Sequence, residues 1–294
     1  MLLTRLRRKA DSAPQATALI VLAIFAAILG GPLLFLGPVD MTGGTGILTL
    51  ETLIAGLPWQ VLLTVFLLAI VAVLGWWGRT ALLRRMQSHV SKALVATVAF
   101  PLVGILVFTL LLFDSETTRH PFTILALILT LNFFVGLSEE LLFRGVVFGG
   151  FRQRQPLISA IITSSMAFGT LHLLNAGVGQ SANDTLFQVF NATALGVLFC
   201  GLVLQGGSLW PAIILHMIWN TYAMLGVAAA EFIGEVAATA PEATPLSGWT
   251  ILLPATILLI GALVIFQYYQ RTGITLWAIV PGDNSPLDST GEQA

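Results

Sequence analysis

The chain contains eight apolar runs, each long enough to cross a membrane as a helix. They lie at residues 16–38, 57–78, 92–113, 121–148, 157–175, 185–205, 208–230 and 249–270. A helix that crosses the hydrocarbon of a bilayer needs roughly 20 mainly apolar residues. Only 9% of the 294 residues are charged, whereas a soluble domain carries roughly a quarter. We therefore predict an all-α, polytopic membrane bundle of about eight transmembrane helices, in an inner or plasma membrane.

The basic residues predict how this bundle is oriented. Short cytoplasmic loops of membrane proteins are enriched in Lys and Arg. If both termini are cytoplasmic, eleven of the 13 basic residues fall on the cytoplasmic side: Arg5, Arg7, Arg8, Lys9, Arg79, Arg84, Arg85, Lys92, Arg152, Arg154 and Arg271. Arg119 falls on the opposite side and Arg144 lies within a span. The charges therefore favour eight spans with both termini cytoplasmic.

Three other segments limit the interpretation. The first apolar run exceeds the 7 to 15 residues of a signal-peptide core, so we expect it to be retained as a transmembrane helix. The stretch 231–247 contains Pro241 and Pro245 and is predicted to be an external loop, and the tail after Pro281 a disordered end. Cys200 is the only cysteine, which excludes an intramolecular disulfide and a cysteine metal cluster.

Five ionisable residues lie inside predicted spans: Glu139, Glu140, Arg144, His172 and His216. Such residues cost roughly 2.5 to 3.5 kcal/mol on insertion scales and are functional candidates. Glu140 precedes Arg144 by four residues, the favourable order for an ion pair on a helix. Glu139 is turned by about 100° around the helix and lacks such a partner, so its carboxylate is a candidate general base. The alternative is that both acids only pair with arginines or with another helix.

Two later spans carry further polar residues. Phe168 and His172 are four residues apart and share a helical face. His216 and Asn220 have the same spacing, and each can donate a hydrogen bond to an oxygen that becomes negative during acyl transfer. A single membrane histidine more often bonds another helix. The catalytic interpretation therefore depends on these residues occurring together.

These residues form three motifs in sequence order. They are Glu139-Glu140-x-x-x-Arg144, Phe168-x-x-x-His172 and His216-x-x-x-Asn220. The set resembles that of the CPBP family, the CAAX prenyl protease and bacteriocin-processing enzymes, also called the abortive-infection family. The resemblance extends over roughly residues 121–225. It implies an intramembrane endopeptidase whose active site lies within a helical bundle.

The resemblance also implies roles for the motif residues. Glu139 would be the general base and His172 its partner in activating a water molecule. His216 and Asn220 would stabilise the oxyanion. The supporting residues would be Glu140, Arg144 and Phe168.

Two chemistries remain open for the water. Glu139, His172 and His216 could form a zinc site with two histidines, one carboxylate and an open position. The chain has no His-Glu-x-x-His helix, the pattern with the clearest zinc geometry. Metal-independent hydrolysis is favoured, with zinc as the alternative.

The predicted organisation and the competing functions complete the interpretation. The segments are a cytoplasmic N-terminus at 1–15, transmembrane helices at 16–120, a catalytic core at 121–230, an external loop with the last transmembrane helix at 231–270, and a cytoplasmic tail at 271–294. We expect the lipid bilayer and a peptide or protein substrate as partners, and no nucleic acid. The alternatives are a non-catalytic immunity or scaffold protein, and a proton-coupled transporter using the same charges. The internal symmetry common in transporters is not evident.

One geometric problem follows from the predicted spans. Glu139 lies near the cytoplasmic end of the fourth span, whereas His172 lies roughly 22 Å along the fifth and His216 roughly 12 Å along the seventh. For the three to meet, either the fifth span begins outside the hydrocarbon, or the fourth is tilted or broken near Gly145 or Gly149.

Overall fold

The computed structural model describes residues 2–36, 50–88, 90–113, 121–236 and 249–280. The helices are α1 (Leu2–Ser12), α2 (Pro14–Leu36), α3 (Leu50–Leu74), α4 (Trp77–Thr80), α5 (Val90–Phe113), α6 (Pro121–Glu140), the π-helix η1 (Leu141–Phe148), α7 (Gly149–Phe151), α8 (Leu157–Leu171), the 3₁₀-helix η2 (His172–Val178), α9 (Ala182–Gly206), α10 (Trp210–Val236) and α11 (Trp249–Thr272). These ranges contain no strand. The predicted all-α class is confirmed.

Eight segments are long and apolar enough to cross a membrane. They are Pro14–Gly31, Leu50–Leu74, Val90–Leu111, Phe122–Phe151, Leu157–Gly177, Ala182–Gly206, Trp210–Ala229 and Ile251–Thr272. Each corresponds to one predicted apolar run. The protein is therefore an integral, multi-pass membrane protein. Which end of the bundle faces the cytoplasm stays a prediction.

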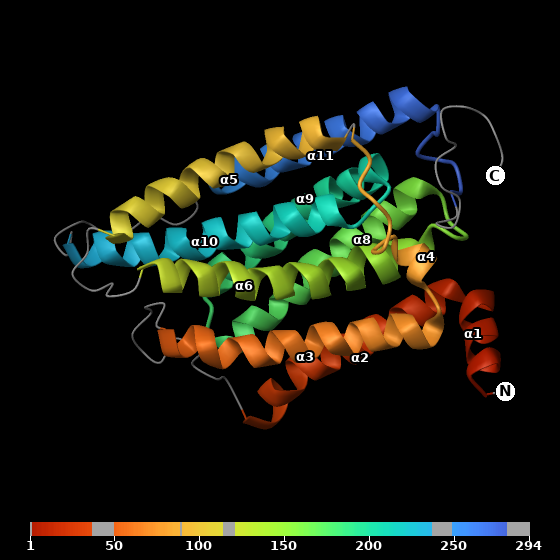
Figure 1. Cartoon of the computed structure of the whole chain (residues 1–294), viewed down its shortest axis with the longest axis horizontal. Helices are drawn as coiled ribbons and strands as arrows, with labels where there is room; N and C mark the ends of the chain where they lie inside the picture. The colour runs from red at the N-terminus through yellow and green to blue at the C-terminus, as the bar shows by residue number, and fades with distance from the viewer. Residues whose placement is uncertain (1, 37–49, 89, 114–120, 237–248, 281–294) are drawn as a thin grey trace.

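The long helices form an elongated bundle with α9 in its interior (Figure 1). Helices α8 and α11 pack against α9, α10 packs against α5 and α6, and α3 packs against α6. Helix α1, α4 and the C-terminal end of α11 all lie at one end of the bundle. Because eight spans are an even number, the first span begins and the last span ends at the same end of the bundle.

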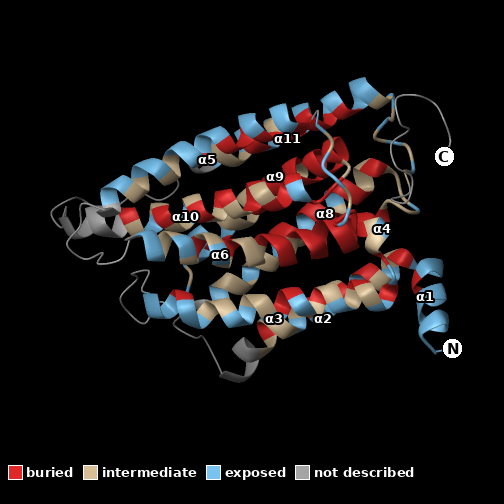
Figure 2. Cartoon of the chain, viewed as in Figure 1, coloured by how far each residue is buried: buried red, intermediate tan, exposed pale blue. Residues whose placement is uncertain are grey.

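Burial is concentrated in the half of the bundle nearer α4 (Figure 2). All eight residues of η1 are buried there. The outer helices instead expose large apolar side chains, and on α5 these include Val95, Phe100, Val103 and Leu110. Lipid tails are as apolar as leucine, so a bilayer accommodates this surface.

Two segments differ from the sequence-based expectations. The N-terminal segment 1–15, for which we predicted no helix, contains α1 at Leu2–Ser12. Helix α10 continues to Val236, so the helix occupies the first residues of the stretch that we predicted as a loop from residue 231. Pro241, Pro245 and the tail after Pro281 lie outside the described residues.

Candidate active site

The segment that follows Glu140 is a π-helix rather than a break. Its hydrogen bonds run from residue i to i+5, a winding that is rare and often found at functional sites. Glycines allow neighbouring backbones to approach this segment closely. A Cβ atom at Gly150 would lie 2.9 Å from the Pro14 carbonyl oxygen, and one at Gly149 would lie 3.2 Å from the Arg79 carbonyl oxygen. Helix α2 and the α4 segment therefore pack directly onto the end of the fourth span.

The fourth span continues through the π-helix without a break, which reduces the difference in depth between Glu139 and His172. The fourth span continues to Phe151, so Glu139 lies twelve residues from its end, at most roughly 18 Å along the axis. His172 lies fifteen residues from the start of α8, roughly 22 Å by the same rise. Helix α8 also crosses α6 at an angle in Figure 1. Extension of the fourth span and the inclination of α8 together bring the motifs to similar depths.

The predicted ion pair of Glu140 with Arg144 is confirmed. Arg144 Nη1 donates to Glu140 Oε1 over 2.9 Å, and both side chains are fully buried. The guanidinium carbon also lies 4.4 Å from the centre of the Phe168 ring and 4.9 Å from that of Phe199. A desolvated cation gains about 2 kcal/mol from such a ring face. The buried arginine is thus stabilised by one carboxylate and by aromatic rings.

His216 lies between the two glutamates. Its Nδ1 is 2.8 Å from Glu140 Oε1, and because a carboxylate only accepts, Nδ1 donates this hydrogen bond. Its Nε2 is 3.5 Å from Glu139 Oε2. The Phe199 ring stacks on the imidazole, with centroids 5.2 Å apart and planes at 12°. The hydrogen bond and the stacking together direct Nε2 toward Glu139.

A glycine explains how α10 reaches this position. A Cβ atom at Gly136 would lie 3.3 Å from the Ile213 carbonyl oxygen and 3.5 Å from the Cβ atom of His216. Because glycine has no side chain, α6 and α10 approach closely one turn before Glu140. This close approach lets the short His216 side chain reach both carboxylates.

His172 stands at the change from α8 to the 3₁₀-helix η2. Its Nδ1 lies 2.9 Å from the Phe168 carbonyl oxygen, which can only accept, so Nδ1 carries the proton. In the neutral ring Nε2 is then an acceptor. The Phe168 ring meets His172 edge-on with centroids 5.0 Å apart, and it lies 5.6 Å from His216. Phe168 therefore joins all three motifs, since it also contacts Arg144.

Asn220 and Glu139 are less constrained. Asn220 follows His216 by one turn of α10, is half-buried, and makes no hydrogen bond to another side chain in the described part of the chain. Glu139 is 20% exposed, whereas Glu140 is fully buried. The Asn220 amide and the Glu139 carboxylate are both accessible to a ligand. The ion-pair contact of Glu139 is with His216 rather than with His172.

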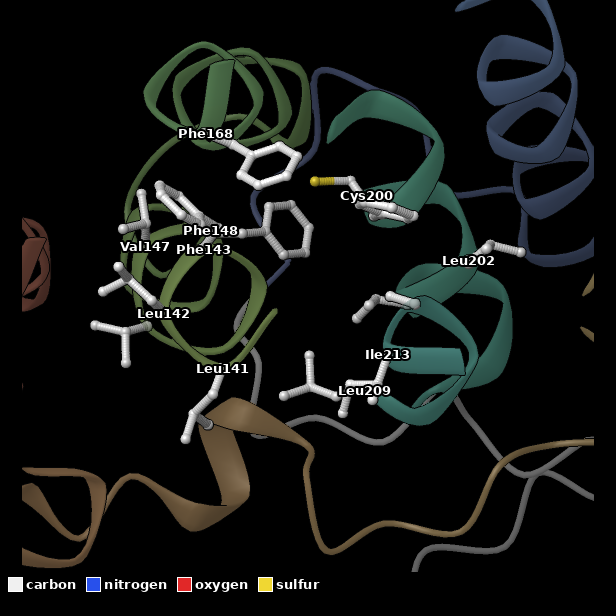
Figure 3. Packing of buried hydrophobic residues seen from close by; sticks show 14 of the residues in the cluster. Leu141, Leu142, Phe143, Val147, Phe148, Phe168, Cys200, Leu202, Leu209 and Ile213 are labelled. Atoms are coloured by element: carbon white, nitrogen blue, oxygen red, sulfur yellow. The ribbon is translucent and has the colours of Figure 1, made fainter. Parts of the chain in front are cut away.

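Phe199 was missed by sequence reasoning. It lies in the apolar run of α9, where an aromatic side chain has no pattern that separates it from ordinary core residues. In the structure it contacts both Arg144 and His216. Figure 3 shows this interior, with Phe143, Phe148 and Phe168 gathered beside Cys200 of α9.

The zinc site that we considered as an alternative does not fit this arrangement. The described residues contain no group of three His, Cys, Asp or Glu side chains placed to hold a metal ion. Glu139 Oε2 and His216 Nε2 lie 3.5 Å apart, but no third described ligand is placed beside them to complete a metal site.

Comparison with known proteins agrees with the motifs. A family model described as "Type II CAAX prenyl endopeptidase Rce1-like" matches residues 121–222, roughly a third of the chain. This range begins at the start of α6 and contains all three motifs. No curated protein matches the chain. Residues 121–222, which carry all three motifs, are thus similar to the Rce1-like family of type II CAAX prenyl endopeptidases.

Proposed function

We propose that the protein is an endopeptidase that hydrolyses peptide bonds of membrane-associated substrates with a water molecule activated by Glu139. The observation that carries this proposal is the pair formed by Glu139 Oε2 and His216 Nε2, 3.5 Å apart inside the bundle. A base and a hydrogen-bond donor that face the same small space can bind a water molecule and a carbonyl group side by side.

In the proposed first step, Glu139 accepts a proton from the water. The water oxygen bonds to the carbonyl carbon, and the carbonyl oxygen becomes an oxyanion. His172, whose Nε2 is free to accept a hydrogen bond, orients the same water. In the second step the C–N bond breaks, and the leaving amine takes the proton held by Glu139. The products are a carboxylic acid and an amine, so atoms and charges balance.

His216 and Asn220 are proposed to stabilise the oxyanion. Asn220 has an amide group without a hydrogen-bonding partner among described side chains, and it donates through Nδ2. Because Nδ1 of His216 already carries a proton, Nε2 donates in the imidazolium form, in which both ring nitrogens are protonated. Glu140 holds the ring by accepting from Nδ1. Loss of one such donor typically reduces the rate by a factor of about 10² to 10³.

The proposed substrate carries an apolar chain. A hollow of about 400 Å³ lies between α2 and the α8–η2 segment, and its lining includes Leu171 and Leu173, the sequence neighbours of His172. Its lining is almost wholly apolar: Leu22, Ala26, Met166, Ala167, Thr170, Leu171, Leu173 and Leu174. Because the family description names prenyl CAAX endopeptidases, a farnesylated peptide with a C-terminal CAAX sequence is the first substrate to test.

The test compares Glu139→Gln with the wild-type protein in reconstituted vesicles. Cleavage of the farnesylated peptide is followed by mass spectrometry of the released C-terminal fragment. We expect the variant to be slower by a factor of about 10² to 10⁴, the usual contribution of a general base. Glu51→Gln, which alters an exposed carboxylate in the first turn of α3, is the matched control and should cleave normally.

If Glu139→Gln cleaves at the wild-type rate, the assignment of the base is wrong. If the wild-type protein does not cleave this peptide, protein termini in membranes of cells with the wild-type or variant protein should be compared. Termini that disappear in the variant identify the substrate. Full persistence of the protein's cellular effect in the variant would favour a scaffold function.

A further inference from the structure

Helix α1 has the composition of a helix that lies on a membrane surface. Its sequence, LLTRLRRKADS, combines three leucines with four basic residues. Successive residues turn by 100°, so the three leucines and Ala10 occupy one face, and Arg5 and Arg8 another. Figure 1 shows α1 running crosswise to the long helices, at the end of the bundle that carries α4. If the long helices cross the bilayer, α1 lies along its surface.

Specific contacts hold α1 in this position. Arg7 donates to the carbonyl oxygens of Ala72 (2.9 Å) and Val73 (3.0 Å), at the C-terminal end of α3. Asp11, one turn later, accepts from the Trp76 indole at 3.1 Å and pairs with Arg79 at 3.0 Å. Helix α1 is therefore fixed at the level where the transmembrane part of α3 ends.

The contacts leave the remaining faces of α1 open. Ala10 is buried against the bundle, but Leu2 is 84% exposed and Leu6 is 45% exposed. The side chains of Arg5, Arg8 and Lys9 are exposed and make no ion pair with another described residue. An amphipathic helix with leucines on one face and cations on another binds at the boundary between headgroups and acyl chains.

The surface around α1 is also positively charged. Exposed basic residues also lie at this end of the bundle outside α1: Arg85, Lys92, Arg154 and Arg271. A basic surface at the depth of the headgroups attracts anionic phospholipids, with about 1 kcal/mol per Lys or Arg near the surface. Charge complementarity thus identifies the partner of this face as an anionic lipid.

We propose that α1 is an interfacial helix that binds anionic phospholipid headgroups through Arg5, Arg8 and Lys9, while Leu2 and Leu6 enter the acyl boundary. Arg7 and Asp11 attach the helix to the bundle, so it recruits anionic lipid to the segment between α3 and α4. This inference does not depend on the proposed peptidase activity.

Lipid binding tests the cationic face. Full-length protein in detergent is titrated with phosphatidylglycerol and with phosphatidylcholine, and bound lipid is counted by native mass spectrometry. The variant R5Q/R8Q/K9Q should lose on the order of a hundredfold in apparent phosphatidylglycerol affinity at low salt, about fivefold per charge. Its binding of phosphatidylcholine should not change. High salt should weaken binding by the wild type more than by the variant.

The control variant R85Q/K92Q/R154Q removes three charges at the same end but leaves α1 intact. We expect it to lose less than tenfold, because these three residues are not on the helix whose leucines enter the acyl boundary. An equal loss in both variants would show that the whole basic end acts without a specific role of α1, and would overturn the proposal. So would wild-type affinity in R5Q/R8Q/K9Q.

A second measurement does not depend on removing charges. Nitroxide labels are placed on Leu6→Cys or Arg8→Cys in vesicles that contain phosphatidylglycerol; Cys200 is fully buried and is not expected to react. The label at residue 6 should collide mainly with oxygen, which concentrates in the acyl region. The label at residue 8 should collide mainly with a water-soluble nickel chelate. Equal access of the chelate to both labels would refute the interfacial position.

Discussion

The buried ion pair makes a quantitative prediction about Arg144. Replacement by Met keeps much of the side-chain volume but removes the charge that faces Glu140 over 2.9 Å. Breaking a buried pair by removal of one partner costs about 3 to 5 kcal/mol, because the other charge stays buried without compensation. Glu140 still accepts from His216 Nδ1. We therefore expect Arg144→Met to lower the free energy of unfolding by about 3 kcal/mol, near the lower end of that range.

Two companion variants separate charge from packing. In Glu140→Gln/Arg144→Met both charges are gone, so the double variant should regain a large part of the stability lost in the single variant. Arg144→Lys keeps the charge but loses the planar group that lies over Phe168 and Phe199. Because lysine does not reproduce this stacking, we expect a loss of about 1 to 2 kcal/mol, smaller than that of Met.

The free energy of unfolding is measured for these proteins and for the single variant Glu140→Gln by denaturant titration in mixed micelles, with tryptophan fluorescence as the signal. The wild type, Glu140→Gln, Arg144→Met and the double variant form a double-mutant cycle, which yields the coupling between residues 140 and 144. If Arg144→Met is as stable as the wild type, or if the double variant is less stable than both single variants, the buried charges do not stabilise each other as argued.

Two other positions lead to shorter predictions. A Cβ atom at Gly196 would lie 2.8 Å from the Cα atom of Ser165, so Gly196→Ala should lose about 1 to 3 kcal/mol of unfolding free energy by overpacking. In the control variant Gly78→Ala nothing lies within 4 Å of the new Cβ atom, so this variant should keep its unfolding free energy. Equal unfolding free energies of the two variants would contradict the packing argument. Phe199→Leu should reduce peptide cleavage at least several-fold, because the ring that orients His216 is lost. The same variant should keep its melting temperature within a few degrees, and unchanged cleavage would show that this ring has no positioning role.

The sequence predicted the architecture well because a bilayer demands so much of each span. Roughly 20 apolar residues must occur together, and interruptions such as those at residues 114–120 and 152–156 are visible in the printed sequence. Helix α1 was missed for the opposite reason. Its basic residues are typical of a cytoplasmic flank, and only the spacing of Leu2, Leu3 and Leu6 among them indicates an amphipathic helix.

The candidate site was predictable only in part. The pairing of Glu140 with Arg144 followed from their spacing, since contact at i and i+4 is a local property of a helix. The position of His216 did not follow, because its contact with Glu140 joins residues far apart in sequence and depends on the close approach at Gly136. Phe199 has no local pattern at all. Contacts between helices depend on packing that no single run of sequence specifies.

The adjacent glutamates differ because the helix around them is buried unevenly. Glu140 is fully buried and accepts from both Arg144 and His216 through the same oxygen, Oε1. Glu139, one residue earlier, is partly exposed and opposes His216 Nε2. One carboxylate is thereby committed to holding a cation and an imidazole, while the other remains accessible to a ligand. If the surroundings of the Glu139 and Glu140 carboxylates were exchanged, every ionisable group would remain in the protein. The arrangement on which the proposed chemistry depends would nevertheless be lost.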